Sequence, residues 1–379
     1  MARDASTPPR WYADGVLRWF IRIALVLAAL GSLAAAARLD DAWWMRHVVT
    51  PACYLPPPFW MRGAVQGGLC LLGGALVFLA LRTRRPTPGA VARSALAVAL
   101  ALCASEAVLR LLERPERRSR HPRLEWLLGK SDPRTGWAFV PSSTLRFGAP
   151  GGGPVVDYRI DAHGDRAPAP EWVEDADAPT LLVTGESIAV GHGLSWKETF
   201  AAQAGARLGL QVVNVAEGGY GSDQALLRAR EALLRLRRPV ALVTVVLAVQ
   251  LHRNLDDARP HLELRDGELQ LLPAFAPHLL LRELLVDQLQ ILPEPRLQRS
   301  LLLTRAILDE TARLARGSGA RPLFVAPVFG PEPLLLRELL EGLPQVVVPL
   351  DPARIMPWDG HPDAQGAREI AEAVVFALR

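Results

Sequence analysis

The chain has 379 residues, of which 50% are hydrophobic and 22% are charged, and its formal net charge at pH 7 is +4. This length predicts two or three structural units. The apolar residues are densest in residues 1–115, which indicates membrane segments followed by a soluble domain. The positive charge is almost all arginine, much of it close to those segments, so a membrane topology is favoured and we expect no nucleic-acid partner.

Residues 1–115 contain three apolar runs, and we predict transmembrane helices at about 16–37, 63–81 and 94–112. The second run is uncharged and long enough to span a bilayer, which takes about 20 residues. The third carries Glu106 and Arg110, four positions apart on one helix face. The first run is short, and its basic start and alanine-rich end also resemble a signal peptide; the long charged lead-in before it favours an uncleaved helix.

The arginines predict the orientation of these helices. Residues 82–93, between the second and third runs, hold four arginines and should stay cytoplasmic. The third helix then exits outward whether or not the first is cleaved. The basic residues 113–123 oppose this orientation, but long domains translocate largely regardless of charge. We therefore expect an integral protein of the cytoplasmic (inner) membrane whose C-terminal domain is extracytoplasmic and faces the periplasm.

Residues 116–178 are rich in proline and glycine and predict a linker and lead-in segment with one or two short strands. From residue 179 to 379, short apolar runs alternate with amphipathic ones. This alternation predicts an α/β domain with a parallel sheet of five strands, flanked by helices on both faces. We expect strands at 180–184, 212–216, 240–249, 322–327 and 345–350, and helices at 196–208, 222–236, 301–316, 331–340 and 363–378.

Residues 255–296 interrupt this alternation and predict an insertion. Its first part, HLELRDGELQLL, has the pattern of a hairpin around Asp266 and Gly267. Its second part, around residues 279–292, predicts an apolar helix. Such a helix could serve as a lid or acyl-chain wall, although its amphipathic spacing favours packing on the domain.

Residues 184–193 read TGESIAVGHG, and two residues separate Ser187 from the first predicted strand. A serine at a strand-to-helix turn has an exposed hydroxyl, and its own backbone N–H can bind a developing oxyanion. The alternatives are an N-cap serine and a phosphate-binding loop, but the phosphate-loop glycine patterns are missing here. His192, beside Gly193, is interpreted as a turn residue.

A nucleophilic serine needs a base, and His361 precedes the last predicted helix with Asp359 two positions before it. An imidazole held by a carboxylate can take the proton of a serine at neutral pH. On its own this cluster also fits an Asp–Gly turn followed by a helix start. The combination with Ser187 favours a catalytic triad.

Three stretches together resemble the blocks of the SGNH/GDSL hydrolases: GESIAVGHGL, VVNVAEGGYGSDQ and DGHPDAQGAREIA, in the family's order. The resemblance runs from about residue 132 to the C-terminus and implies a flavodoxin-like three-layer sandwich. It further implies that Ser187 is the nucleophile, His361 the base and Asp359 its orienting acid. The backbone N–H groups of Ser187 and Gly219 would form part of the oxyanion hole.

Two departures from the family pattern stand out. Glu186 replaces the usual aspartate before the serine, and VVLAVQLHRNLDD lacks the family's GxND, whose asparagine completes the oxyanion hole. We expect Gln250 or Asn254, ahead of His252, to supply this third donor. Losing such a donor costs about 10²–10³ in rate.

The predicted function is therefore a membrane-anchored serine esterase acting on an acylated small molecule, glycan or lipid. We expect no cofactor and no metal, because His361 and Asp359 alone are too few ligands. One alternative is an O-acyltransferase of the same chemistry, since water exclusion decides between the two outcomes. Another is an SGNH-fold binding or scaffold protein, which the missing GxND favours and the intact triad disfavours.

Overall fold

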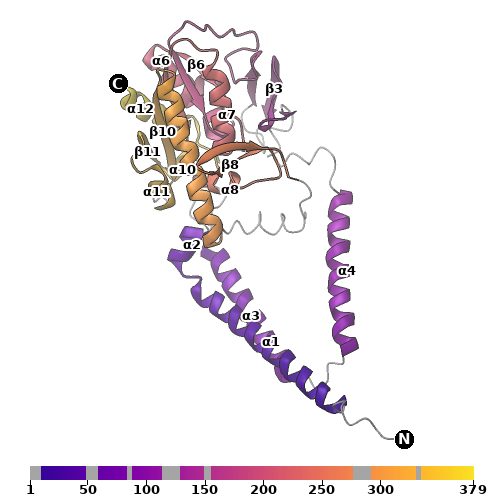
Figure 1. The fold of residues 1–379 in the computed structure, drawn as a ribbon. Helices are drawn as coiled ribbons and strands as arrows, with labels where there is room; N and C mark the ends of the chain where they lie inside the picture. The colour runs from indigo at the N-terminus through magenta and orange to yellow at the C-terminus, as the bar shows by residue number, and fades with distance from the viewer. Residues whose placement is uncertain are drawn as a thin grey trace, which may run out of the picture. The chain divides into compact units, whose positions relative to one another are not determined.

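The computed structural model describes residues 10–47, 59–82, 88–112, 129–148, 155–275, 292–329 and 334–379. The chain forms two compact units (Figure 1). The first contains the helices α1 (Arg10–Arg38), α3 (Phe59–Arg82) and α4 (Pro88–Leu112). The second contains all the described strands and the helices from α5 onward. The short helix α2 (Asp41–His47) begins in the first unit and ends in the second.

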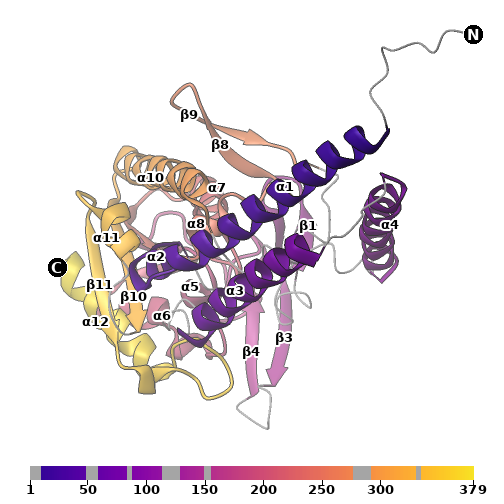
Figure 2. The same ribbon diagram turned by 90° about the horizontal axis from the view of Figure 1, so that it is seen from below.

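In the first unit, α1 and α3 pack against each other along their lengths (Figure 2). The Ser32 hydroxyl donates to the Leu69 carbonyl at 2.8 Å, and the Gln66 amide donates to the Ala36 carbonyl at 2.9 Å. One polar side chain of each helix thus bonds to a backbone carbonyl of the other.

Two helices of the described chain are long and apolar enough to cross a membrane. Their spans are Trp19–Arg38 and Arg62–Arg82, with only 17% and 11% of their apolar windows buried. In α4 the qualifying apolar stretch, Ala99–Val108, is shorter than a span. A signal sequence passes the same test as the first helix, so insertion and orientation remain predictions.

The second unit is built on a parallel sheet of five strands in the order β11-β10-β7-β5-β6, which confirms the predicted fold class. The strands are β5 (Thr180–Thr184), β6 (Gln211–Asn214), β7 (Pro239–Val245), β10 (Arg321–Phe329) and β11 (Gln345–Leu350). All five residues of β5 are buried. Continuous burial of this kind is typical of a strand covered on both faces.

Helices cover both faces of this sheet (Figure 1). One layer contains α6 (Phe200–Leu208) and α12 (Ala364–Leu378), which contact each other as well as β6 and β11. The other contains α7 (Ser222–Leu233) and α10 (Glu294–Gly317), which contact β5 and β10. The short helix α11 (Leu334–Leu340) follows β10 and contacts α10. The result is a three-layer sandwich.

Most predicted elements occur close to their expected bounds, and the clearest difference is at β7. This strand ends at Val245, before the predicted end at residue 249, because the chain turns into the short helix α8 (Gln250–Arg253). Val246 still donates its N–H to the Val325 carbonyl at 2.9 Å. The apolar run therefore continues as a buried turn at the end of the sheet.

The insertion begins with the predicted hairpin, formed by β8 (His261–Arg265) and β9 (Glu268–Leu272). Asp266 and Gly267 both have positive φ, 52° and 82°, as a tight two-residue hairpin turn requires. The helix predicted around residues 279–292 lies almost entirely outside the described residues.

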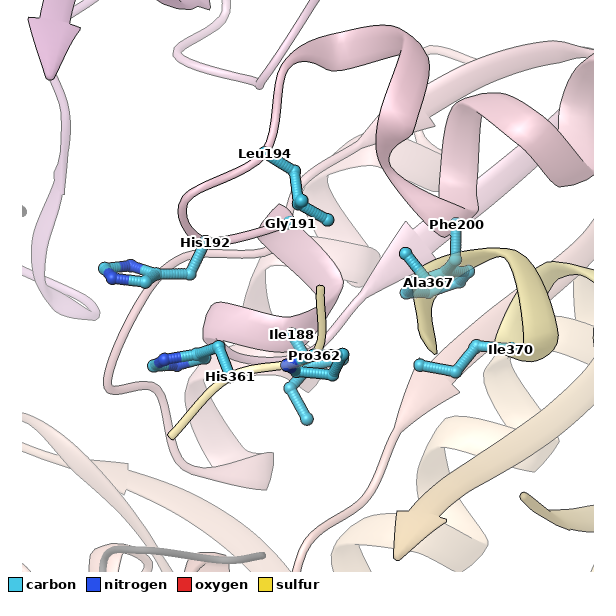
Figure 3. A pocket seen from close by; sticks show the side chains of 9 residues that line it. All are labelled: Ile188, Gly191, His192, Leu194, Phe200, His361, Pro362, Ala367 and Ile370. Atoms are coloured by element: carbon cyan, nitrogen blue, oxygen red, sulfur yellow. The ribbon is translucent and has the colours of Figure 1, made fainter. Parts of the chain in front are cut away.

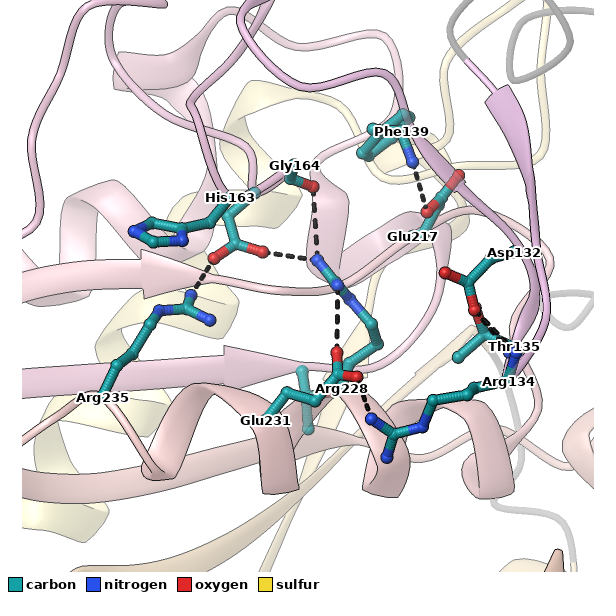
Figure 4. A network of polar contacts seen from close by, with 12 residues as sticks. Asp132, Arg134, Thr135, Phe139, His163, Gly164, Glu217, Arg228, Glu231 and Arg235 are labelled. Carbon is teal, nitrogen blue, oxygen red and sulfur yellow. Dashed lines mark hydrogen bonds and ion pairs between the residues drawn. The ribbon is translucent and has the colours of Figure 1, made fainter.

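The lead-in forms two antiparallel pairs, β1 (Gly129–Asp132) with β2 (Gly136–Phe139) and β3 (Ser143–Gly148) with β4 (Val155–Ile160). It belongs to the same compact unit as the sheet. Figure 4 shows the polar contacts that join the two: Glu217 accepts the Phe139 N–H at 3.0 Å, and Arg228 reaches the Gly164 carbonyl. Arg228 also donates to Asp165 at 2.6 Å. These contacts hold the lead-in beside β6 and α7.

Candidate active site

The three sequence blocks meet beyond the carboxyl ends of the strands, where parallel sheets usually carry their sites. Ser187 begins α5 (Ser187–Val190), three positions after β5 ends. Gly219 lies between β6 and α7, and Asp359 and His361 lie between β11 and α12. Parallel pairing of neighbouring strands brings these distant segments to one edge.

The predicted triad residues form a continuous chain of hydrogen bonds, from Ser187 through His361 to Asp359. His361 Nε2 lies 2.6 Å from Ser187 Oγ, and His361 Nδ1 lies 2.5 Å from Asp359 Oδ1. Their loop is closed by the Met356 N–H, which donates to the His361 carbonyl at 2.9 Å, and by a bridge between Ile355 and Pro362. The closure holds the imidazole toward the serine.

The ionisation of Asp359 decides which ring nitrogen of His361 carries the proton. Burial raises the pKa of this carboxyl, but hydrogen bonds from His192 and His361 outweigh burial, and the net pKa lies well below its ordinary value. An ionised carboxylate only accepts hydrogen bonds. His361 therefore carries its proton on Nδ1 when neutral, so the lone pair of Nε2 can accept the proton of Ser187.

A second imidazole, from His192, meets the other oxygen of Asp359. His192 Nε2 lies 2.9 Å from Asp359 Oδ2, and the rings of His192 and His361 lie 4.2 Å apart at an angle of 31° (Figure 3). Burial lowers the pKa of His192, although the hydrogen bond with Asp359 partly opposes this. His192 does lie in a turn, as expected, but its side chain points into the site, which the sequence interpretation missed.

The loop that carries His192 is fixed by the lead-in. The buried Arg166 guanidinium donates to the carbonyls of Val190 and Gly191 at 2.7 and 2.8 Å, and to that of Leu194. It also stacks on the Tyr158 ring at 4.0 Å, and the Tyr158 hydroxyl accepts the N–H of Gly193. The sequence signal for this role was weak, since nothing in YRIDAHGDR itself pairs Arg166 with carbonyls 24 or more positions later.

Gly193 is required by the path of this loop. Its φ is +71°, and a Cβ placed there would lie 2.6 Å from the Trp358 ring and 2.8 Å from Met356 Sδ. Only a residue without a side chain fits this close approach. The glycine therefore lets the serine block pack against the loop that carries Asp359 and His361.

Glu186 competes for the proton of Ser187. Its Oε2 lies 2.5 Å from Ser187 Oγ, and its Oε1 accepts the Ile188 N–H at 2.9 Å, which makes it the N-cap of α5. The hydroxyl has one proton, so it donates either to Glu186 or to His361. Arg253 Nη1 lies 3.7 Å from Glu186 Oε2 and offers this carboxylate an alternative partner.

Two backbone donors are available for an oxyanion. Among the described residues, no acceptor lies in hydrogen-bond geometry with the N–H of Ser187 or with that of Gly219. Ser187 is the first residue of a helix, where N–H groups have no intrahelical partner. Gly219 has a φ of +74° in the turn after β6.

The expected third donor, Gln250 or Asn254, is not provided by either side chain in this structure. The Gln250 amide donates to the Val245 carbonyl at 3.3 Å, and the Asn254 amide donates to Thr304 Oγ1 at 2.8 Å. Both side chains are fully buried and brace α8 against its neighbours. His252, ranked behind them, is only half-buried in α8. The turn at α8 thus directs both amides into the core in this structure.

Two further features border the site. His192, Asp359 and His361 each offer one atom that could ligate a metal, and these three atoms lie within 4.8 Å of one another, close enough to hold a cation. The hydrogen bonds among them already account for their positions. Beside the two imidazoles is a small hollow of about 10 Å³ with mostly apolar walls (Figure 3). Its lining includes Ile188, Leu194, Phe200, Ala367 and Ile370.

No protein-family model matches this chain, and no curated protein is a significant match. Similar solved structures include TesA, at 19% identity over 53% of this chain and 98% of that chain, with a TM-score of 0.33. A carbohydrate acetylesterase family member from Sinorhizobium meliloti is 14% identical over 53% and 97%, with a TM-score of 0.32. A member of the lipolytic protein G-D-S-L family from Veillonella parvula is 11% identical over 52% and 96%, with a TM-score of 0.31. Because these scores are low, we infer the chemistry from the geometry of the site itself.

Proposed function

We propose that this protein is a serine esterase in which Ser187 is the nucleophile, His361 the general base and acid, and Asp359 the group that orients His361. The observation that carries this proposal is the unbroken contact from Ser187 Oγ to His361 Nε2 at 2.6 Å and from His361 Nδ1 to Asp359 Oδ1 at 2.5 Å. Such a chain lets a serine lose its proton at neutral pH.

The reaction has two halves. As Ser187 Oγ bonds to the ester carbonyl carbon, its proton passes to His361 Nε2, and the carbonyl oxygen becomes an oxyanion that accepts from the N–H groups of Ser187 and Gly219. The oxyanion then collapses, and the leaving alcohol takes the proton back from His361. Water repeats the sequence on the acyl-serine and releases the acid.

Hydrolysis is favoured over transfer to another hydroxyl by the exposure of the site. The side chains of Asp359 and His361 are 25% and 17% exposed, so water reaches the acyl-enzyme from this side. An acyltransferase would need to exclude that water. A non-catalytic scaffold role has no need of the aligned triad.

We further propose that the esterase is anchored in the inner membrane and faces the periplasm, where it deacylates an envelope glycan or lipid. The two largely unburied apolar helices and the arginines of residues 82–93 support this topology. A C-terminal alkaline phosphatase fusion should be active, whereas a C-terminal green fluorescent protein exported through the same helices should be dark. The reverse result would place the domain in the cytoplasm.

The function is tested by labelling the full chain, in detergent micelles, with a fluorophosphonate that bonds to activated serines. We expect the wild type to label. Ser318→Ala is the control and should label equally, because Ser318 is the C-cap of α10 and takes no part in the site. Ser187→Ala should not label while melting at the wild-type temperature. Equal labelling of Ser187→Ala would refute the assignment of the nucleophile. A folded wild type that neither labels nor hydrolyses 4-nitrophenyl acetate would favour a binding protein.

A further inference from the structure

His192 lies outside the triad, yet it contacts two of the triad residues. Its Nε2 faces Asp359 Oδ2 at 2.9 Å, and its ring stacks on His361 with 4.2 Å between centroids. Only 7% of the residue is exposed. The backbone N–H of His192 donates to the Ser187 carbonyl at 2.9 Å, so the position of this residue is coupled to that of the nucleophile.

The proton on the facing nitrogen of His192 can be assigned from its partner. Because Asp359 is ionised, each of its oxygens accepts, and Nε2 of His192 must carry a hydrogen. Asp359 therefore receives one N–H on each oxygen, from His192 on Oδ2 and from His361 on Oδ1. Held at both oxygens, the carboxylate has one orientation.

The charge of His192 also matters to its neighbour. The ionisable groups that face it are Asp359, His361 and Glu186, and burial among them lowers its pKa. A neutral His192 donates to Asp359 without placing a second positive charge 4.2 Å from the ring of His361. The imidazolium that forms during acylation is then stabilised by Asp359 without repulsion from His192.

We propose that His192 is a positioning residue of the esterase: it holds the second oxygen of Asp359 and covers one face of His361, so that His361 Nε2 stays aimed at Ser187. This inference rests on the proposed function and assigns a fourth side chain to the same site. No substrate contact is assigned to His192; its Nε2 faces Asp359.

Two amide substitutions separate this role from simple packing. The side-chain nitrogen of glutamine reaches the position of histidine Nε2, whereas that of asparagine is one bond shorter and falls short of Asp359. Both replacements are neutral at every pH and similar in polarity. His192→Gln therefore keeps the donor and His192→Asn removes it.

In assays of the full chain with 4-nitrophenyl acetate, we expect His192→Gln to keep kcat within about threefold of wild type. His192→Asn should lower kcat about tenfold, equivalent to about 1.4 kcal/mol, with KM nearly unchanged. The acid limb of its pH–rate profile should move up by about half a pH unit, because Asp359 with one donor fewer stabilises the imidazolium more strongly. Equal kcat and profiles for both variants would overturn the proposal, and so would a loss of kcat in His192→Asn with an unmoved acid limb.

A spectroscopic measurement keeps this test separate from that of the function. In proton NMR of the full chain, the imidazole N–H of His361 that bonds to Asp359 should give a far-downfield signal, assigned by its loss in His361→Gln. We expect this signal to persist in His192→Gln and to broaden or vanish in His192→Asn. An unchanged signal in His192→Asn would refute the positioning role, even if the wild type proved inactive and the proposed function failed.

Discussion

His361 Nε2 lies 2.6 Å from Ser187 Oγ although 174 positions separate the two residues. The contact exists because β5 and β11 belong to one parallel sheet, whose strands deliver the following segments to the same edge. Each partner is then fixed locally, Ser187 by the turn into α5 and His361 by a closed loop before α12. The proposed chemistry of the site rests on this pair.

The first prediction concerns Asp359, which should be needed for turnover rather than for folding. Asp359→Asn presents an amide to His361 and favours the wrong tautomer, so we expect kcat to fall roughly 10³–10⁴-fold with little change in KM. Asp363→Asn is the matched control, since Asp363 caps α12 by accepting the Gly366 N–H and asparagine caps equally well. Comparable losses of kcat in the two variants would contradict the role of Asp359.

The second prediction concerns Glu186, which competes with His361 for the proton of Ser187. Glu186→Gln still caps α5 through its amide oxygen, but its amide nitrogen donates to Ser187 and thereby directs the hydroxyl proton to His361. We expect this variant to keep or raise kcat/KM. Glu186→Ala should lower the free energy of unfolding by about 1 kcal/mol, because the N-cap of α5 is lost. Its melting temperature should fall accordingly. A tenfold drop in kcat/KM for Glu186→Gln at unchanged stability would show that the carboxylate itself is required.

The third prediction concerns Arg166, whose guanidinium donates to three backbone carbonyls in the loop of residues 190–194. Arg166→Lys keeps the charge but cannot serve three carbonyls in one plane, so we expect a loss of about 2–4 kcal/mol in the free energy of unfolding and a weaker esterase. Arg237→Lys is the control, because Arg237 is 68% exposed in its pair with Asp177 and should change stability by less than about 0.5 kcal/mol. Thermal melts of the full chain compare the two, and equal melting temperatures would contradict the prediction.

The fourth prediction is a pH dependence of stability from Glu217. Burial raises the pKa of this carboxyl to about 8, against the lowering effect of Arg228 and of hydrogen bonds from Tyr220 and Phe139. The pKa of Glu217 is thus higher in the folded protein than in the unfolded chain, where it is near 4.5. Between pH 4.5 and about 8, Glu217 is therefore protonated in the folded protein and ionised in the unfolded chain. Stability from this group is complete below the unfolded pKa and is lost as pH rises through about 8.

Melting temperatures of the full chain between pH 5 and 9 test the role of Glu217. Glu217→Gln keeps a neutral acceptor for the Phe139 N–H at every pH and should flatten the decline that we expect for the wild type toward pH 9. The difference between the two proteins should grow with pH. Parallel curves for wild type and variant would mean that Glu217 does not carry the dependence.

Local patterning determined much of this fold in advance. The apolar runs around residues 180–184 and 322–327 predicted buried parallel strands, and β5 and β10 occur there, because continuous apolar character is what burial on both faces requires. The place of Ser187 three positions beyond a strand, and of Asp359 and His361 before the last helix, was likewise readable from the chain. Local sequence was therefore enough to predict the sheet and to name the three residues of the proposed triad.

The tertiary structure decided where the remaining side chains point. Gln250 and Asn254 had the right chemistry for an oxyanion donor, but the turn into α8 directs both amides into the core. His192 had the features of a turn residue, and Arg166 and Tyr158 hold its loop so that it faces Asp359. A side-chain direction depends on the path of the turn that carries it, and contacts from segments far away in the chain set that path.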